Sequence, residues 1–160
     1  MSEEKRGCIV AVRIRGNVGI RPEFKKTMRL MHLPKRNHST IISNTSSHIG
    51  VLKKVKDYIT WGEATSETVH LLLRKRGKII GDEDLTDHYV SEKLGYKSFR
   101  AFADAITLSE VEFWKTPGVK PVFRLHPPKG GFRKSIKKPY PNGELGFRGK
   151  DINKLIEKMV

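Results

Sequence analysis

The chain has 160 residues, 37% of them hydrophobic, and carries 32 lysines and arginines against 17 aspartates and glutamates. Its net charge of +15 favours a polyanionic partner, and its single cysteine, Cys8, excludes an internal disulfide and a thiol-based metal cluster. No apolar stretch approaches the ~20 residues that span a membrane, and residues 1–6 lack the apolar segment of a secretory signal, so a soluble intracellular protein is expected.

The charge is concentrated at the two ends of the chain. Residues 1–62 hold 13 basic and 4 acidic side chains, residues 63–120 hold 9 and 10, and residues 121–160 hold 10 and 3. Two basic ends of net +9 and +7 therefore flank a middle of net −1. A positive charge that served only solubility would not separate in this way, so we expect both ends to face a polyanion.

The first part of the chain predicts a strand followed by a helix. The strand, residues 8–15, is apolar on both faces until Arg13 and Arg15, which is typical of a strand that runs from a core to a binding edge. The helix begins near Pro22, a residue suited to the first helical turn. One face of this helix is apolar, and a separate face carries Arg21, Lys25, Arg29 and His32.

Two more strands and a helix continue this part of the chain. Residues 38–43 predict a strand, Ser46 or Ser47 is expected to cap a helix with lysines on its outer face, and residues 58–62 predict a short third strand. This β-α-β-α-β order favours parallel pairing when it is considered alone.

The middle of the chain is expected to be helical. Apolar periodicity predicts helices over residues 66–76, over residues 86–94 and from Ser98 onward. Residues 122–125 predict a short strand. Asp151 is expected to cap the last helix, which places its apolar residues on one face: Ile152, Leu155, Ile156 and Met159.

The segment 123–138 is the strongest indication of a partner. Six of its sixteen residues are lysine or arginine, and none is acidic. Pro127-Pro128 imposes an extended path, and Gly130-Gly131 adds backbone freedom that a packed core would not need. We expect such a segment to require a densely negative partner to become ordered, and nucleic acid fits that requirement.

No constellation of catalytic or metal-binding residues is evident. The six histidines lack metal-ligand spacing, residues 82–84 lack the spacing of a calcium loop, and neither a phosphate-binding loop nor a nucleophile elbow occurs. Residues 16–19 match the G-x-x-G loop of KH domains, but here the loop joins a strand to a helix, so it indicates a turn that touches phosphate. We therefore expect no catalytic residue, no metal and no cofactor.

The residues resemble a known family. Residues 8–62 are similar to the large-subunit ribosomal protein numbered thirty in bacteria and seven in eukaryotes, in the strand, in Gly19-Ile20-Arg21, in the basic helix and in Ile49-Gly50-Val51. Residues 57–63 and 124–131 resemble signatures of its longer archaeal and eukaryotic form. The chain length and the absence of a long basic N-terminal arm resemble the archaeal form.

The resemblance implies an α+β fold of the ferredoxin-like class, a β-α-β-α-β core with a three-stranded antiparallel sheet, which replaces the parallel pairing above. It implies a compact RNA-binding core over residues 1–63, an added helical region over 64–121, and a basic extended tail over 122–160 whose C-terminal helix packs back on the core. The implied role is a structural constituent of the large ribosomal subunit in the cytoplasm. It would bind and stabilise ribosomal RNA beside neighbouring ribosomal proteins, with no catalysis.

Charge and placement select the candidate RNA-binding residues. In the compact core they are Arg13, Arg15, Arg21, Lys25, Arg29, Lys35, Arg36, Lys53 and Lys54. In the tail they are Arg124, His126, Lys129, Arg133, Lys134, Lys137, Lys138, Arg148 and Lys150.

Two other classes of function stay open. A free-standing RNA chaperone or translational regulator would bind many RNAs with similar affinity and would not purify stoichiometrically with the large subunit. An RNA-processing enzyme would use a histidine, and substitution of His126 or His38 would then abolish turnover while RNA binding is kept.

Overall fold

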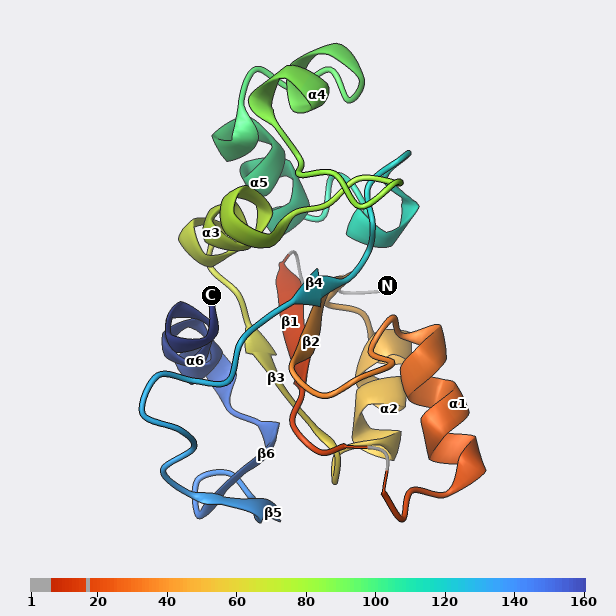
Figure 1. Cartoon of the computed structure of the whole chain (residues 1–160), viewed down its shortest axis with the longest axis vertical. Coiled ribbons are helices and arrows are strands. Elements are labelled where there is room, and N and C mark those ends of the chain that lie inside the picture. The colour runs from red at the N-terminus through yellow and green to blue at the C-terminus, as the bar shows by residue number, and fades with distance from the viewer. Residues whose placement is uncertain (1–6, 17) are drawn as a thin grey trace.

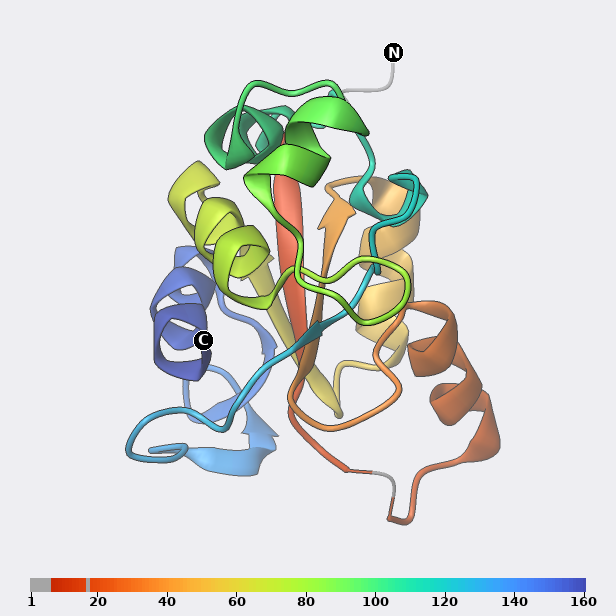
Figure 2. The same cartoon turned by 45° about the horizontal axis from the view of Figure 1, so that its top comes forward.

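A computed structural model describes residues 7–16 and 18–160 and shows one sheet with helices on both of its faces (Figures 1 and 2). Residues 1–6 of the predicted core and Asn17 of the predicted G-x-x-G turn lie outside the described residues. The strands are β1 (Cys8–Arg13), β2 (His38–Ser43), β3 (Ile59–Glu63), β4 (Phe123–Arg124), β5 (Ser135–Pro139) and β6 (Gly143–Phe147). The helices are α1 (Pro22–Leu30), α2 (Ser46–Lys54), α3 (Ser66–Arg76), α4 (Asp87–Glu92), α5 (Phe99–Thr107) and α6 (Ile152–Met159), with short 3₁₀ turns η1 (Phe113–Lys115) and η2 (Gly149–Asp151).

The sheet is larger than expected. β1 pairs antiparallel with β2 on one side and with β3 on the other, so the parallel pairing that strand order alone favoured is wrong for these strands. The full order, however, is β4-β2-β1-β3-β6-β5, with β6 parallel to β3. An α+β fold is thus confirmed, and the three-stranded sheet is extended to six strands by segments from the tail.

The two faces of β1 belong to two separate cores. Val10 and Val12 pack into a cluster shared with α3, α5 and α6. Ile9 and Ala11 pack into a second cluster shared with α1 and α2. Every residue of β1 is buried because both faces of this central strand are covered, which the continuous apolar run in the sequence predicted.

The cap of helix α2 lies one residue before the predicted position. The side chain of Thr45, and not that of Ser46 or Ser47, accepts a hydrogen bond from the backbone N–H of His48, at 3.3 Å. A threonine side chain in this position satisfies one of the unpaired N–H groups of the first turn. At the other end of the helix Lys53 and Lys54 lie exposed beside its free carbonyls.

The middle of the chain forms the three predicted helices. Thr65, Thr86 and Ser98 each cap one of them by accepting a backbone N–H bond. The helix predicted over residues 86–94 is shorter and ends at Glu92. In Figure 1 these helices lie beyond one end of the central strands, away from β5 and β6.

The tail returns to the sheet through a tight contact at Gly62. A Cβ atom at Gly62 would lie 2.0 Å from the carbonyl oxygen of Gly149, so β3 accepts the turn η2 only because this residue has no side chain. The helix α6 follows at once, and Ile152 and Ile156 enter the core. The predicted cap residue, Asp151, makes no cap bond; its carboxylate accepts a hydrogen bond from the hydroxyl of Tyr140 instead.

Candidate nucleic-acid interface

The basic side chains at the two ends are mostly not neutralised by the protein itself. In the described parts of the chain, α1 and the turn after it expose Lys25, Arg29, Lys35 and Arg36 with no carboxylate partner. Arg21, at the start of α1, approaches Glu23 only at 4.0 Å, and both side chains are largely exposed. Exposed cations grouped in one part of the chain would attract a polyanion.

Arg13 does not belong to that surface. It is fully buried, and its guanidinium donates hydrogen bonds to the carbonyl oxygens of Leu33 at 3.0 Å and Pro34 at 2.8 Å. Burial lowers the pKa of Arg13. This arginine therefore fixes the connection between α1 and β2, and it cannot reach a phosphate in this conformation. The sequence could not show this because an arginine at a strand end has the same pattern in either role.

Arg15 is half-buried, so it is intermediate between the exposed cations of α1 and the buried Arg13. Its guanidinium is 5.4 Å from the centre of the Tyr58 ring, and one of its N–H groups donates to the carbonyl oxygen of Asp57 at 3.4 Å. The contact orders the side chain at the edge of the sheet while leaving other N–H groups available.

Arg148 is the second predicted residue that lies inside the protein. Its guanidinium pairs with the Glu144 carboxylate at 2.9 Å, and its Nε donates to Oγ1 of Thr60 at 2.8 Å. The side chains of Arg148 and Glu144 are only 7% and 9% exposed. The pair joins β6 to β3 and supports the wall of a pocket, so Arg148 is structural in this conformation.

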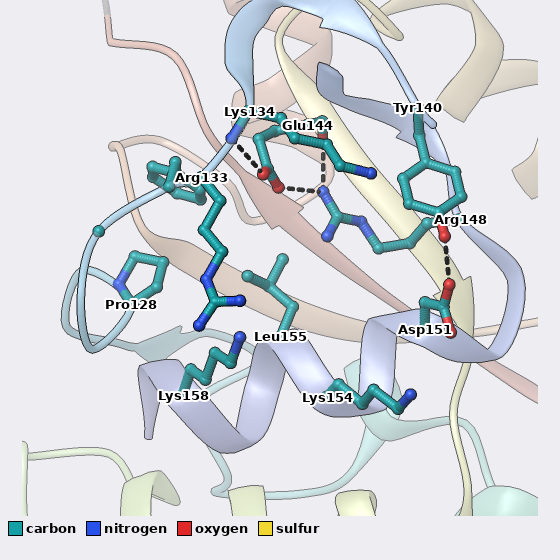
Figure 3. A pocket seen from close by; sticks show the side chains of 12 residues that line it. Pro128, Arg133, Lys134, Tyr140, Glu144, Arg148, Asp151, Lys154, Leu155 and Lys158 are labelled. Atoms are coloured by element: carbon teal, nitrogen blue, oxygen red, sulfur yellow. Dashed lines mark hydrogen bonds and ion pairs between the residues drawn. The ribbon is translucent and has the colours of Figure 1, made fainter. Parts of the chain in front are cut away.

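This pocket, which we call the tail pocket, lies between the segment after β4 and helix α6 and has a volume of about 210 Å³. Figure 3 shows the guanidinium of Arg133 beside the ammonium group of Lys158, with Lys154 one turn earlier on the same helix. Like charges held together are unfavourable unless a counterion lies between or over them. The cations of the tail pocket would therefore attract an anion.

The carboxylates of the tail pocket are already engaged. Glu144 accepts from Arg148 and from the backbone N–H of Lys134, at 3.1 Å, and Asp151 accepts from Tyr140. Within residues 7–16 and 18–160, nothing acidic pairs with Arg133, Lys154 or Lys158. The unbalanced charge of the pocket is consequently positive.

Lys154 and Lys158 were missed by the sequence reasoning. They are four residues apart on α6, on the face opposite its buried residues. That i, i+4 spacing on an amphipathic helix was the available signal, but the helix was interpreted only as a packing element.

The remaining predicted residues are exposed but not all equivalent. Arg124 pairs with Asp82 at 3.1 Å, and Lys120 pairs with the same carboxylate at 3.0 Å. The hydrogen bond from Lys120 and the positive charges of Arg124 and Lys120 lower the pKa of Asp82. Lys134 donates to the carbonyl oxygen of Pro141 at 2.6 Å. Within the described residues, no side-chain partner is seen for Lys53, Lys54, His126, Lys129, Lys137, Lys138 and Lys150.

Residues 7–16 and 18–160 contain no group of three or more histidine, cysteine, aspartate or glutamate side chains that could hold a metal ion. None of the helices formed by these residues is long and apolar enough to cross a bilayer. Cys8 is buried, and burial raises the pKa of its thiol to about 12, which keeps it protonated.

Comparisons with known proteins find a matching family and similar chains. The sequence model of a family described as Ribosomal protein L30p/L7e matches residues 9–59. The "Large ribosomal subunit protein uL30" of Methanopyrus kandleri is 48% identical over 149 residues, covering 92% of this chain and 100% of that protein. The protein of the same name from Archaeoglobus fulgidus is 46% identical, with 92% and 97% covered, and that of Korarchaeum cryptofilum is 40% identical, with 100% and 99% covered.

Proposed function

The chain belongs to the L30p/L7e family of ribosomal proteins, and from that premise we propose that it is a structural constituent of the large ribosomal subunit, where it binds ribosomal RNA. Its place is then the cytoplasmic ribosome, beside neighbouring ribosomal proteins, and its role involves no catalysis. The observation that carries the proposal is the tail pocket, where Arg133, Lys154 and Lys158 converge with no acidic partner among the described residues.

RNA contact is assigned to two surfaces. One consists of the exposed cations of α1, α2 and the turn after α1, and the other is the tail pocket with the lysines of β5. Lys and Arg would neutralise phosphates and release counterions, while the sheet holds the two surfaces in a fixed relation. Arg13 and Arg148 are left out of this set because their guanidinium groups are used inside the protein.

Each of the three parts of the chain has a different role in this proposal. We infer that residues 1–63 are the compact RNA-binding core, and that the described part of it, with β1 between antiparallel β2 and β3 and with α1 and α2 on one face, is of the ferredoxin-like class. Residues 64–121 are the added helical region, whose nearly neutral surface suits a protein neighbour. Residues 122–160 form the basic tail, and α6 supports it from the core.

Sedimentation of a cell extract in moderately high salt tests the function. The protein is quantified across the gradient, and a one-to-one ratio with the large subunit is expected because many phosphate contacts act together. A peak among free proteins would overturn the structural role and would leave a loosely bound chaperone or regulator as the better interpretation.

A further inference from the structure

A second pocket lies on the face of the sheet that α1 and α2 cover. Its volume is about 260 Å³, and Ile49 of α2 and Trp61 of β3 are among its apolar lining. Phe147, the last residue of β6, closes one side of it. This pocket, which we call the aromatic pocket, is separate from the tail pocket, and the two have no lining residue in common.

Phe147 is unusual in being exposed. It is 52% accessible, and among the described residues it is the one phenylalanine, tyrosine or tryptophan that is exposed. Its ring centre is 6.3 Å from that of Trp61, at an interplanar angle of 48°. The buried Trp61 thus supports Phe147 from one side and leaves part of its ring open to solvent.

The backbone of β6 is built to present this ring. In a regular strand, residues two apart share a face, yet Leu145 packs into the core that contains α6 while Phe147 lines the aromatic pocket with Trp61. Gly146 between them has φ of +83°, a left-handed conformation that glycine adopts without strain. The irregular residue turns Phe147 out of the core that holds Leu145.

Polar groups without internal partners surround the ring. The amide of Asn44, the ammonium of Lys53 and the carboxylate of Glu63 all line the aromatic pocket. Within the described residues none of these side chains makes a hydrogen bond or an ion pair. An apolar side chain from a protein partner would cover these groups and leave them unsatisfied, which is costly.

We propose that the aromatic pocket binds one unpaired guanine base of an RNA, stacked on Phe147. The inference rests on the proposed RNA-binding function and adds a base-specific contact to it. Unpaired bases are recognised by stacking on aromatic rings and by hydrogen bonds along their edges. Guanine has two adjacent N–H donors, at N1 and N2, which match the two acceptor oxygens of Glu63, and it has acceptors at O6 and N7 for Lys53.

RNA hairpins with a loop of eight uridines test the proposal with the full-length protein. In three further hairpins, one central uridine of the loop is replaced by guanosine, adenosine or cytidine. We expect the guanosine hairpin to bind about tenfold more tightly than the all-uridine hairpin. Phe147→Ala should remove that advantage and leave the affinity for the all-uridine hairpin nearly unchanged.

Matched variants separate stacking from general adhesion. Phe147→Trp should keep the guanosine preference, while Phe147→Leu, which is apolar but not flat, should lose it. Glu63→Gln should lower the preference because one acceptor oxygen becomes a donor. Lys54 is next to Lys53 on α2 but does not line the aromatic pocket. Lys54→Gln should therefore weaken the binding of all four hairpins by a similar factor. Urea unfolding midpoints of the Phe147 variants should stay close to that of the wild type.

The results that would overturn the base pocket differ from those that would overturn the proposed function. Equal affinity of the wild type for the four hairpins, or a Phe147→Ala protein that keeps the guanosine preference, would overturn the base pocket and leave the RNA-binding role standing. A wild-type protein that binds neither the hairpins nor purified large-subunit ribosomal RNA would overturn the proposed function itself.

Discussion

Basic side chains have a carboxylate partner more often in the middle of the chain than at its two ends. In the middle, Lys78 pairs with Asp84, Arg100 approaches Asp104 at 3.6 Å, and Lys115 approaches Glu112 at 3.0 Å. At the ends, most cations of α1, α2, β5 and α6 have no such partner among the described residues. Net charge per segment pointed to this contrast, and four of the nine cations of residues 63–120 have a carboxylate partner: Lys78, Arg100, Lys115 and Lys120.

The buried pair between Glu144 and Arg148 is an exception at the basic ends, and it gives the largest expected effect. Replacement of Glu144 by alanine leaves the buried guanidinium of Arg148 without its carboxylate. Removal of one partner of a buried ion pair is expected to lower the free energy of unfolding by about 3–5 kcal/mol. Urea unfolding followed by circular dichroism measures this loss.

A double variant checks the physical reason for that loss. Glu144→Leu with Arg148→Met replaces both charges by apolar groups and should recover most of the stability, since no buried charge is left unpaired. A Glu144→Ala protein that loses less than about 1 kcal/mol would mean that water reaches Arg148 and that the pair is not a buried one.

The second largest effect is expected on RNA affinity. It tests whether the cations of the tail pocket differ from the paired cations in the middle of the chain. The triple variant Arg133→Gln, Lys154→Gln, Lys158→Gln should bind large-subunit ribosomal RNA more weakly. The slope of log affinity against log salt should become less negative by about 0.7–0.9 for each lost phosphate contact.

The matched triple variant lies in the middle of the chain. Lys78→Gln, Arg100→Gln, Lys115→Gln removes the same formal charge from side chains that already have carboxylate partners. Its salt slope should stay close to that of the wild type. Equal changes in the two triple variants would show that only net charge matters and that the tail pocket has no special role.

The contrast between the regions also explains what the sequence could predict. Charge segregation and apolar periodicity predicted the basic ends, the central β1 and the helices α3, α5 and α6, because these features repeat along several residues. The strands β5 and β6 were missed. Their residues show no clean alternation, and Gly146 with its positive φ breaks the period of two in β6. Their pairing depends on long-range contacts such as the one between Gly62 and Gly149.

The roles of single arginines were the least predictable part of the site. Arg13, Arg133 and Arg148 all lie in basic stretches of sequence, yet only Arg133 faces solvent. Burial of the other two depends on acceptors that are distant in the chain: the carbonyl oxygen of Leu33 for Arg13 and the Thr60 hydroxyl for Arg148. A local pattern of charges contains no information about such acceptors. It therefore predicts that a basic surface exists more reliably than it predicts which arginines belong to that surface.

A third effect is a dependence of stability on pH. Burial lowers the pKa of His38, and the nearby positive charges of Arg124, Lys35 and Arg13 lower it further. Above the unfolded pKa of about 6.5 the histidine is neutral in both states and contributes nothing. As the pH falls below about 6.5, the unfolded chain takes up a proton that the folded chain resists, so stability decreases until the lowered folded pKa is reached.

Urea midpoints at pH 7.5 and pH 5 measure the effect of His38. The drop between these values should be smaller in His38→Gln than in the wild type, although burial also lowers the pKa of His32 and part of the drop should remain. His126→Gln, at an exposed position, is the control and should leave the drop unchanged. A His38→Gln protein with the full wild-type drop would contradict the assignment to His38.

The smallest effect is expected where the middle region pairs its charges at the surface. The side chains of Lys115 and Glu112 are 80% and 46% exposed, so water and salt screen their attraction and most of the pairing energy is offset by lost side-chain freedom. Glu112→Gln should therefore change the free energy of unfolding by no more than about 0.5 kcal/mol. It should nevertheless free one cation, so a gain in RNA affinity measured at low salt would reveal that the middle region is kept away from RNA by its pairing. An unchanged affinity would mean that the geometry of the fold, rather than local neutralisation, already keeps this region out of contact.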